Sequence, residues 1–494
     1  MIFDRFKDAA RQHRDELAII DGDRRITYGR LLELVGGMHA WLQKTLNPQA
    51  GDVVAVSMSN TAQFVACFFA VSELGCVFMP CNPQWRAGEL RRFAARLGFT
   101  GVVTEPQFRK TWEQAGALKA ESVLTVPDAE TRCEPCIAPV AYSRSEDAPA
   151  VYLATSGSMG VPRAASRSHR NLVATARNTA RTIGIGPERR FLSVVPFFHV
   201  SGFSNSMLMP LLHGATVVLM RRFTAAACAD LIHRERVDVL IGSPVIFGFL
   251  ADSVEDASLL ASLQLCFSAG ARLPAAVSGR WRDRFGVRVR QWYGTSETGT
   301  VAIDLSPDDG PSRAAAFVGA PIAGVEVRII DPGGRLLSPG AAGEVTVRSE
   351  AVMAGYAGEP ELNQHIFADG FFKTGDLGHV DTEGNLYLTG RMRPVINAGG
   401  VKVDPVEIEE TIEALPSVSA CRVDAVAEGR AGEVIRARVV VRQGQRMTRR
   451  DVIEQCRLSL AEYKLPRIVE FVETLPTTMT GKIPAAWVSD GSDT

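Results

Sequence analysis

The stretch ATVVLMRRFTAAACADLIHRERVDVLIG, residues 215–242, decides the fold class. It begins with the apolar run 215–219 and ends with the apolar run 239–242, and each run has the length of a buried strand. A helical pattern occupies residues 225–236 between them. A strand, a helix and a second strand in this order are typical of a parallel sheet covered by helices on both faces. The sequence therefore predicts an α/β fold.

The same alternation of apolar runs and helical patterns continues towards the N-terminus, where residues 53–57 form another strand-length run. From about residue 317 the pattern changes to short alternating strands, such as 325–330 and 343–348, separated by turns. Alternating runs joined by glycine- and proline-containing turns are typical of antiparallel strands. The sequence therefore predicts parallel sheets in the first part of the chain and a smaller β-rich region after them.

The C-terminal part of the chain has a third pattern, consisting of two helices and three strands. The two helices and the first two strands are expected at 405–415, 448–461, 418–423 and 434–441. This pattern fits a small α+β domain of about 100 residues. We expect the boundary within 390–394, because Pro394 disfavours helix at the residue before it.

Charge and apolarity limit the functions that the chain can serve. The 494 residues contain 54 Lys and Arg against 55 Asp and Glu, so the net charge of −1 gives no broad field for nucleic acid. The most apolar stretch, 64–79, contains Glu73 and is too short to span a bilayer. Charged residues at the N-terminus disfavour a signal peptide. We therefore expect a cytoplasmic protein that binds no nucleic acid and has no membrane span.

The strongest local signal for function is TSGSMG, residues 155–160, which follows the apolar run 150–153. Its glycines allow the backbone to approach a ligand closely, and its hydroxyls and amides can donate to phosphate oxygens. It lacks the Gly-Lys-Ser/Thr ending of a Walker A loop. An ordinary polar loop after a strand is the alternative interpretation, and the motif alone does not separate the two.

Two further motifs contain side chains that suit a nucleotide. WYGTSE, residues 292–297, offers an aromatic face for a base, a glycine, hydroxyls for phosphate and a carboxylate for Mg²⁺. FKTGD, residues 372–376, is followed by Gly-Arg at 390–391; its Asp can accept from ribose hydroxyls, and the Arg can hold phosphate or ribose oxygens. Taken singly, the first is better explained by a buried aromatic pair beside a surface glutamate, and the second by solvated turn charges.

A fourth motif, TGKI at 480–483, places a lysine beside a glycine turn. Such a lysine can reach a developing negative charge, although single lysines are usually solvated. The four motifs gain meaning from their occurrence together, in this order, in one chain.

The ordered motifs resemble those of the adenylate-forming superfamily, which comprises acyl- and aryl-CoA synthetases, luciferases and the adenylation domains of peptide synthetases. The resemblance covers nearly the whole chain, and its pattern is closest to the acyl- and aryl-CoA ligases. Besides the four motifs it rests on residues 26–28 (ITY), 64–83, 196–199 (PFFH), 268–271 (SAGA) and 343–344 (GE). Several ordered motifs spread along a chain argue against chance similarity.

The resemblance implies an α/β fold with a large N-terminal domain, made of two parallel-type α/β subdomains and a small β-rich subdomain, followed by a small, mobile α+β C-terminal domain. We expect the N-terminal domain, with the ATP and acid sites, at 1–391. The C-terminal domain, with the adenylation lysine, is expected at 392–494. In the family the C-terminal domain rotates after adenylation, and residues 399–402 would then line the acceptor tunnel.

The resemblance also implies which residues bind ATP. Residues 155–160, the phosphate-binding motif, would hold the β- and γ-phosphates, and Ser296 would touch phosphate. Tyr293 would stack on adenine, and Asp376 would bind the ribose hydroxyls. The implied ATP-binding residues are Thr155, Ser156, Gly157, Ser158, Gly160, Gly270, Ala271, Tyr293, Gly294, Thr295, Ser296, Asp376 and Arg391.

Three residues would act in the reaction, with ATP and Mg²⁺ as the expected cofactors. Glu297 would hold Mg²⁺, and Lys482 would bridge the reacting carboxylate and the α-phosphate. His199 would separate the acid pocket from the acceptor tunnel, the alternative being a partly buried core histidine. Such a reaction depends on preorganised cations and amides around phosphate and needs no protein nucleophile.

Two positions depart from the family pattern. Arg163 stands where lysine is usual, and a planar guanidinium does not replace an ammonium contact for contact. Arg393 occupies the hinge position, where Asp or Lys is usual, and Pro394 restricts its backbone torsions. The second departure bears on domain rotation and therefore on the transfer step.

The acid is expected to be apolar. Peptide-synthetase domains have an Asp after the His199 position to pair with an amino group, and here Val200 stands there, so a buried ammonium would be left without a partner. Phe198, Phe203 and Trp292 favour an aryl or medium fatty acid. The sequence does not choose between them.

CoA is the leading acceptor, because EYKLP at 462–466 resembles the C-terminal domains of CoA ligases. An amine, giving an amide, or a separate carrier protein remains an alternative. A luciferase-like oxygenase would share the ATP-binding residues, and a non-catalytic relative would be expected to lose Glu297 or Lys482, both of which are present.

Overall fold

The structure is a computed structural model, and the chain divides into two compact units. The first unit consists of Met1–Pro83, Leu90–Ala154 and Arg163–Gly390, and the second contains Gln84–Glu89 and a main segment that starts at Arg391. The residues that the structure describes are 1–127, 145–155, 163–307, 316–392, 395–428 and 433–475.

The larger sheet of the first unit contains a run of parallel strands in the order β13-β12-β11-β9-β10-β1, with antiparallel β2 at its edge. The predicted strand–helix–strand stretch appears in it as β10, α8 and β11, which confirms the α/β expectation. These strands are β1 (Leu17–Asp21), β2 (Arg24–Thr27), β9 (Arg190–Ser193), β10 (Thr216–Leu219), β11 (Val239–Gly242), β12 (Leu265–Ala269) and β13 (Val289–Thr295).

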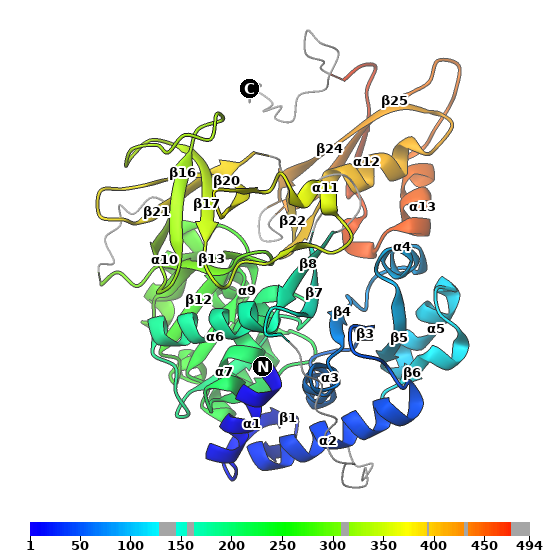
Figure 1. The fold of residues 1–494 in the computed structure, drawn as a ribbon. Helices are drawn as coiled ribbons and strands as arrows, with labels where there is room; N and C mark the ends of the chain where they lie inside the picture. The colour runs from blue at the N-terminus through cyan, green and yellow to red at the C-terminus, as the bar shows by residue number, and fades with distance from the viewer. Residues whose placement is uncertain (128–144, 156–162, 308–315, 393–394, 429–432, 476–494) are drawn as a thin grey trace. The chain divides into compact units, whose positions relative to one another are not determined.

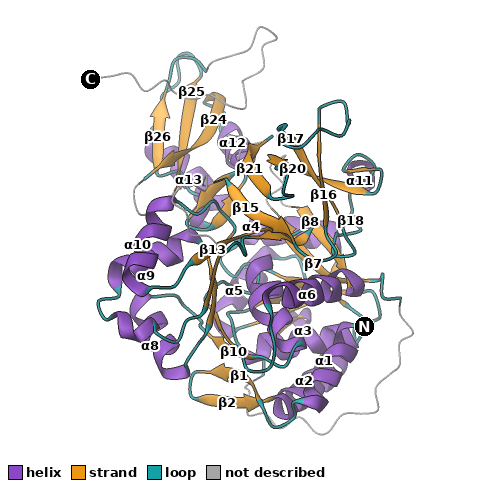
Figure 2. Cartoon of the chain, turned by 90° about the vertical axis from the view of Figure 1, so that its left-hand side faces the viewer, coloured by secondary structure: helices purple, strands orange, loops and turns teal. Residues whose placement is uncertain are grey.

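Helices cover both faces of this sheet. Successive side chains of a strand point to opposite faces, so neighbouring residues of one strand pack against different helices. Leu240 packs in the apolar cluster that contains Ile232 of α8 and Phe247 of α9, whereas Val239 and Ile241 pack in the cluster of α6. Figure 2 shows α8, α9 and α10 on one side of the sheet and α6 on the other. The helices are α6 (His169–Ile183), α7 (Met209–Leu212), α8 (Ala225–Glu235), α9 (Pro244–Ser253) and α10 (Ala275–Phe285).

The predicted β-rich region is antiparallel, and it continues the same sheet. β14 and β15 pair antiparallel beside β13, and β15 pairs with β21, so that 14 strands form one sheet. This continuity was not predicted. The added strands are β14 (Gly299–Ile303), β15 (Phe317–Pro321), β16 (Glu326–Ile330), β17 (Gly343–Arg348), β19 (Phe367–Ala368), β20 (Phe371–Val380) and β21 (Leu386–Arg391).

A second sheet of seven strands has the order β18-β8-β7-β4-β3-β5-β6. Its core is aromatic: Phe68 lies edge-on to Phe78, with ring centroids 5.3 Å apart, and to Phe203, at 4.9 Å. The strands are β3 (Val53–Ser57), β4 (Val77–Pro80), β5 (Phe99–Thr104), β6 (Val123–Thr125), β7 (Pro149–Thr155), β8 (Arg163–Ser168) and β18 (Gly355–Tyr356). Neighbouring helices are α1 (Ile2–Gln12), α2 (Tyr28–Thr45), α3 (Ala62–Glu73), α4 (Ala87–Leu97), α5 (Pro106–Ala115) and α11 (Pro360–Asn363).

The main segment of the second unit has the predicted α+β composition. Figure 1 shows α12 and α13 beside β24 and β25, and Ile408 of α12 and Val452 of α13 share one apolar cluster with Val439 of β25. A capping box between Thr448 and Asp451 begins α13. The elements are β22 (Ile396–Ala398), β23 (Val401–Val403), α12 (Pro405–Glu413), β24 (Val418–Ala427), β25 (Glu433–Val441), α13 (Arg449–Ser459) and β26 (Ile468–Phe471).

Among the described residues, no helix is both long and apolar enough to cross a membrane. The cysteines that the structure describes are free thiols, and all of them are buried. The apolar stretch 64–79 forms most of α3 and the start of β4, which lie in the core of the second sheet.

Candidate active site

The motif at 292–297 lies at the carboxyl end of β13, beside the carboxyl end of its parallel neighbour β12. β12 leads directly into Gly270, whose φ of +84° lies in the left-handed region that glycine adopts without strain. Ala271 follows it. In parallel α/β sheets, ligands bind outside the carboxyl ends of strands. The predicted residues Gly270, Ala271 and Tyr293 therefore lie at the carboxyl ends of the strands, where a ligand is expected.

A tight hydrogen-bonded turn presents Glu297. The Oγ1 of Thr295 accepts from the backbone N–H groups of Glu297 and Thr298, both at 3.2 Å, and the N–H of Thr295 donates to Oγ1 of Thr298 at 3.1 Å. A Cβ at Gly294 would lie 2.2 Å from the carbonyl oxygen of Gly299, so only glycine allows this close approach. Thr295 and Gly294 therefore shape the turn.

Tyr356 contacts the Glu297 carboxylate, a role that the sequence did not indicate. Its hydroxyl donates to Oε1 of Glu297 at 2.8 Å. Burial, together with the negative charge of Glu297, raises the pKa of Tyr356 well above its ordinary value, so the hydroxyl remains a donor at neutral pH. Tyr356 belongs to β18, a strand of only two residues, and a Gly-Tyr pair carries no local signal for such a contact.

Arg163, the first departure from the family pattern, lies next to this pair. Its guanidinium carbon is 5.4 Å from the centroid of the Tyr356 ring, within the range of a cation–π interaction. Its charge is therefore close to the tyrosine that holds Glu297.

A second pair joins the predicted adenine-binding and ribose-binding residues. The hydroxyl of Tyr293 donates to Oδ2 of Asp376 at 2.6 Å, and both side chains are buried. The backbone of β20 is fixed at this point, because the N–H of Asp376 donates to Oγ1 of Thr374 at 3.0 Å and the N–H of Gly375 donates to Glu344 at 3.2 Å. Two motifs far apart in the sequence therefore meet at one end of β13.

His199 precedes an irregular helix. Its carbonyl oxygen accepts from the N–H of Phe203 at 2.8 Å, and its ring centroid is 4.5 Å from that of Phe198. The π-helix Ser201–Leu208 follows directly, and helices of this type are frequent at functional sites. Phe203 itself is fully buried in the core around Phe68.

Part of the predicted site lies outside the described residues. Thr155 is the last residue of β7 and Arg391 the last residue of β21, and both are assigned to the second unit. The predicted residues outside the described ranges are Lys482, Ser156, Gly157, Ser158, Gly160, Arg393 and Pro394.

The donor set fits a Mg²⁺ ion held together with nucleotide phosphates. In the part of the chain that the structure describes, no group of three or more His, Cys, Asp or Glu side chains could hold a metal by itself. Mg²⁺ in nucleotide sites is usually bound by one or two carboxylates plus phosphate oxygens. Glu297, oriented by Tyr356, provides such a carboxylate.

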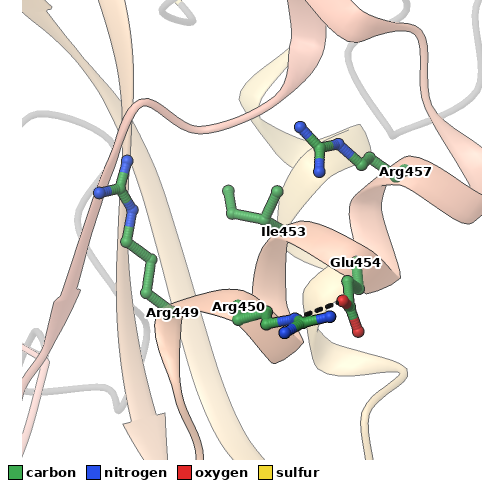
Figure 3. A pocket seen from close by; sticks show the side chains of 5 residues that line it. All are labelled: Arg449, Arg450, Ile453, Glu454 and Arg457. Atoms are coloured by element: carbon green, nitrogen blue, oxygen red, sulfur yellow. Dashed lines mark hydrogen bonds and ion pairs between the residues drawn. The ribbon is translucent and has the colours of Figure 1, made fainter.

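A separate pocket of 580 Å³ lies on α13 of the second unit, and none of the predicted site residues within the described ranges lines it (Figure 3). Arg450 donates to Glu454 at 2.7 Å, Arg449 donates to the carbonyl oxygen of Arg467 at 2.7 Å, and Arg457 lies 3.5 Å from Glu462. Arg450 and Arg457 are therefore paired with carboxylates, whereas Arg449 bonds a neutral carbonyl oxygen.

Comparison with known proteins identifies the family. The family model described as "AMP-binding enzyme" matches residues 6–357, and the model of its C-terminal domain matches residues 407–482. The chain belongs to this family, the adenylate-forming superfamily that its motifs resemble.

The most similar relatives include CoA ligases. A feruloyl-CoA synthase from an Amycolatopsis species is 32% identical over 480 residues, covering 96% of this chain and 95% of the relative. A double mutant of o-succinylbenzoate CoA synthetase from Bacillus subtilis matches with a TM-score of 0.88 at 25% identity, covering 97% of both chains. The amide bond synthetase McbA from Marinactinospora thermotolerans matches with a TM-score of 0.88 at 29% identity, covering 98% of both.

Proposed function

We propose that the protein is an ATP-dependent, AMP-forming ligase that activates a carboxylic acid and transfers the acyl group to CoA. The observation that carries the proposal is the pair of contacts at the end of β13, where Tyr293 holds Asp376 and Tyr356 holds Glu297. Membership of the AMP-binding enzyme family over most of the chain and the similarity to feruloyl-CoA synthase support it. A cytoplasmic location is part of the proposal.

The proposed reaction has two steps. A carboxylate oxygen of the acid attacks the α-phosphorus of ATP, and pyrophosphate leaves with the electrons of the broken P–O bond. The thiol of CoA then attacks the acyl carbon, loses its proton, and displaces AMP. Both steps concentrate negative charge on phosphate oxygens, which preorganised cations and amides stabilise.

We assign the residues of this chain to those steps as follows. Asp376 accepts from the ribose hydroxyls while Tyr293 lies against the base. The carboxylate of Glu297 holds Mg²⁺, which neutralises phosphate charge when bound. Lys482 would approach the α-phosphate and acid oxygens during the first step, and the C-terminal domain, proposed at 392–494, would carry it away before the second.

The proposed acid is an aryl or medium fatty acid. Val200 follows His199, so no carboxylate is placed there for an ammonium group. Phe198 is partly exposed beside His199 and can contact an apolar acid. The name feruloyl-CoA synthase, given to a relative 32% identical, favours an aryl acid.

An amine acceptor is the second candidate, and one observation favours it. The amide bond synthetase McbA aligns over 98% of this chain with a TM-score of 0.88. Its fold is as similar to this one as that of the CoA synthetase from Bacillus subtilis, also at 0.88. The fold is therefore as compatible with an amine acceptor as with a thiol. A separate carrier protein is a less supported acceptor.

Mass spectrometry of the products tests both candidates. ATP, Mg²⁺ and a panel of aryl and fatty acids are incubated with CoA, with simple amines, or with neither, and Lys482→Ala serves as the matched variant. A thioester formed only with CoA supports the leading proposal, and an amide without thioester supports the second. Absence of acyl-adenylate with every acid would contradict both, and unchanged adenylate formation by Lys482→Ala would contradict the role of the lysine.

A further inference from the structure

A fully buried arginine lies beneath the Glu297 turn. Arg167 belongs to β8, the strand that follows the phosphate-binding motif in sequence, and its relative exposure is 0%. Arginine is rarely buried completely unless its charge is paired. Within the described part of the chain, the guanidinium of Arg167 donates to carbonyl oxygens and a threonine hydroxyl, and none of these acceptors is a carboxylate.

The guanidinium connects three segments of the first unit. Its Nη1 donates to the carbonyl oxygen of Ser296 at 2.8 Å. Its Nη2 donates to the carbonyl oxygen of Ala351 at 2.7 Å and to Oγ1 of Thr175 at 2.9 Å. Ser296 immediately precedes Glu297, so one of these bonds fixes the peptide next to the predicted metal ligand.

The segment that follows Ala351 contacts the same turn. The N–H of Met353 donates to the carbonyl oxygen of Glu297 at 2.8 Å, and Tyr356 farther along the segment donates to the Glu297 carboxylate. By holding Ser296 and Ala351 at once, Arg167 fixes the turn and the strand that carries its tyrosine. A planar guanidinium with several donors suits such a junction better than any other side chain.

Packing alone does not explain this residue. Burial lowers the pKa of Arg167 to about 10, and the charge of Glu297 offsets part of that effect, so the guanidinium is charged at neutral pH. Burying a charge costs free energy unless the charge is paired and hydrogen-bonded. A buried cation next to a metal ligand therefore indicates a demand for orientation and charge.

We propose that Arg167 is a positioning residue that fixes the Ser296–Glu297 turn for binding of Mg²⁺ with ATP. It acts through Glu297 and does not touch the nucleotide. The inference rests on the proposed function for the identity of the ligand, and it adds a residue outside the motifs to the machinery of that site.

The test compares Arg167→Met and Arg167→Lys with Arg189→Met in the full-length chain. Arg189 bonds Asp238 at 2.8 Å near the amino ends of β9 and β11, the end of the sheet opposite to the Glu297 turn. Calorimetric binding of ATP is measured with saturating Mg²⁺ and with EDTA, and melting temperatures are recorded for each variant. The ratio of the two affinities reports the Mg²⁺ contribution separately from folding.

For Arg167→Met we expect the affinity for ATP with Mg²⁺ to fall by about tenfold or more, the size expected for losing a charge-assisted hydrogen bond. The affinity in EDTA should change much less, Arg167→Lys should be intermediate, and Arg189→Met should keep the wild-type ratio. If Arg167→Met does not fold, Thr175→Val, which removes one acceptor of the guanidinium, should lower the ratio in the same direction.

An unchanged Mg²⁺ ratio in Arg167→Met, or in Thr175→Val where Arg167→Met does not fold, would overturn the inference. So would equal losses with and without Mg²⁺ that follow the melting temperature, because those indicate a purely structural role. Nucleotide binding is measured without turnover. A wild-type protein that binds ATP with Mg²⁺ but forms no acyl-adenylate would therefore contradict the proposed function and leave this inference standing.

Discussion

Two buried cations, Arg167 in the first unit and Lys464 in the second, have different surroundings. Arg167 in the first unit is surrounded by neutral oxygens from Ser296, Ala351 and Thr175. Lys464 in the second unit donates to the carboxylates of Glu407, at 2.8 Å, and Glu89. The charge of Lys464 is compensated by carboxylates bonded to it, whereas Arg167 bonds neutral oxygens and only part of its charge is offset, by the nearby Glu297.

The pKa values of the two cations move in opposite directions. For Lys464, burial alone would lower the pKa, but the carboxylates of Glu407 and Glu89 outweigh it and raise the pKa. For Arg167, burial dominates and lowers the pKa to about 10. A charge bonded to carboxylates can serve stability by itself, whereas a buried charge bonded only to neutral oxygens needs another reason to remain. We assign the first to folding and the second to the site.

The largest expected effect comes from breaking the compensated cluster. Lys464→Met leaves Glu407 and Glu89 buried without their cation, and removing one partner of a buried pair usually costs about 3–5 kcal/mol. We therefore expect the second unit to lose about that much stability. Hydrogen exchange of amides in β24 and β25, measured in the full chain, reports it.

The control for this change adds Glu407→Gln to Lys464→Met. Removing a carboxylate together with the lysine relieves the uncompensated charge, so the double variant should be more stable than Lys464→Met alone. If the stability losses of the two substitutions simply added, the cluster would not act as a unit. The contrast with Arg167 would then lose its basis.

Glu297→Gln should affect chemistry instead of stability. The substitution keeps the shape but removes the charge that we assign to Mg²⁺, so acyl-adenylate formation should fall about 10²–10³-fold, as for other lost electrostatic groups in active sites. Pyrophosphate release measures the rate, and thermal melting should change little. The control is Glu235→Gln, which removes the charge of a buried carboxylate bonded to Arg25 at 2.9 Å. This variant should instead be less stable, and its rate per folded molecule should be unchanged.

Tyr356→Phe should give a smaller effect of the same kind. The variant loses only the hydrogen bond to Glu297, so kcat/KM for ATP with Mg²⁺ should fall by roughly tenfold. The matched control is Tyr28→Phe, which removes a buried hydroxyl that donates to the carbonyl oxygen of Ala215 at 2.7 Å. A rate unchanged in Tyr356→Phe would mean that the turn holds Glu297 without help.

The smallest expected effect is a difference in alkaline stability. The folded state binds the Lys464 proton more tightly than the unfolded chain, so its contribution is complete below the ordinary lysine pKa of 10.5 and is lost as pH rises through the raised value. The slope approaches about 1.4 kcal/mol per pH unit at most. Denaturant unfolding measured below and above pH 10.5 should show this loss of stability in the wild type. The profile of unfolding free energy against pH should be flatter in Lys464→Met. Parallel profiles would show that the pKa is not raised.

Much of the fold could be predicted because it follows from local patterns. The strand at 239–242 and the helix beginning at 225 are found as β11 and α8, since apolar spacing of two or 3.6 residues is visible in a short window. The region 325–348 was identified as antiparallel strands for the same reason. That β15 joins this region to the parallel strands depends on pairing between β15 and β21, over 60 residues apart, which no local window contains.

The sequence by itself determined the α/β class, the family and the motif residues Tyr293, Glu297 and Asp376, because these depend on residue type and order. Only the tertiary structure decided which side chains hold them. Tyr356 and Arg167 reach the Glu297 turn from 59 and 129 residues away in sequence. A buried arginine and a solvated one look the same in a sequence. Their difference arises when strand pairing brings carbonyl oxygens from distant segments around the guanidinium and excludes water from it.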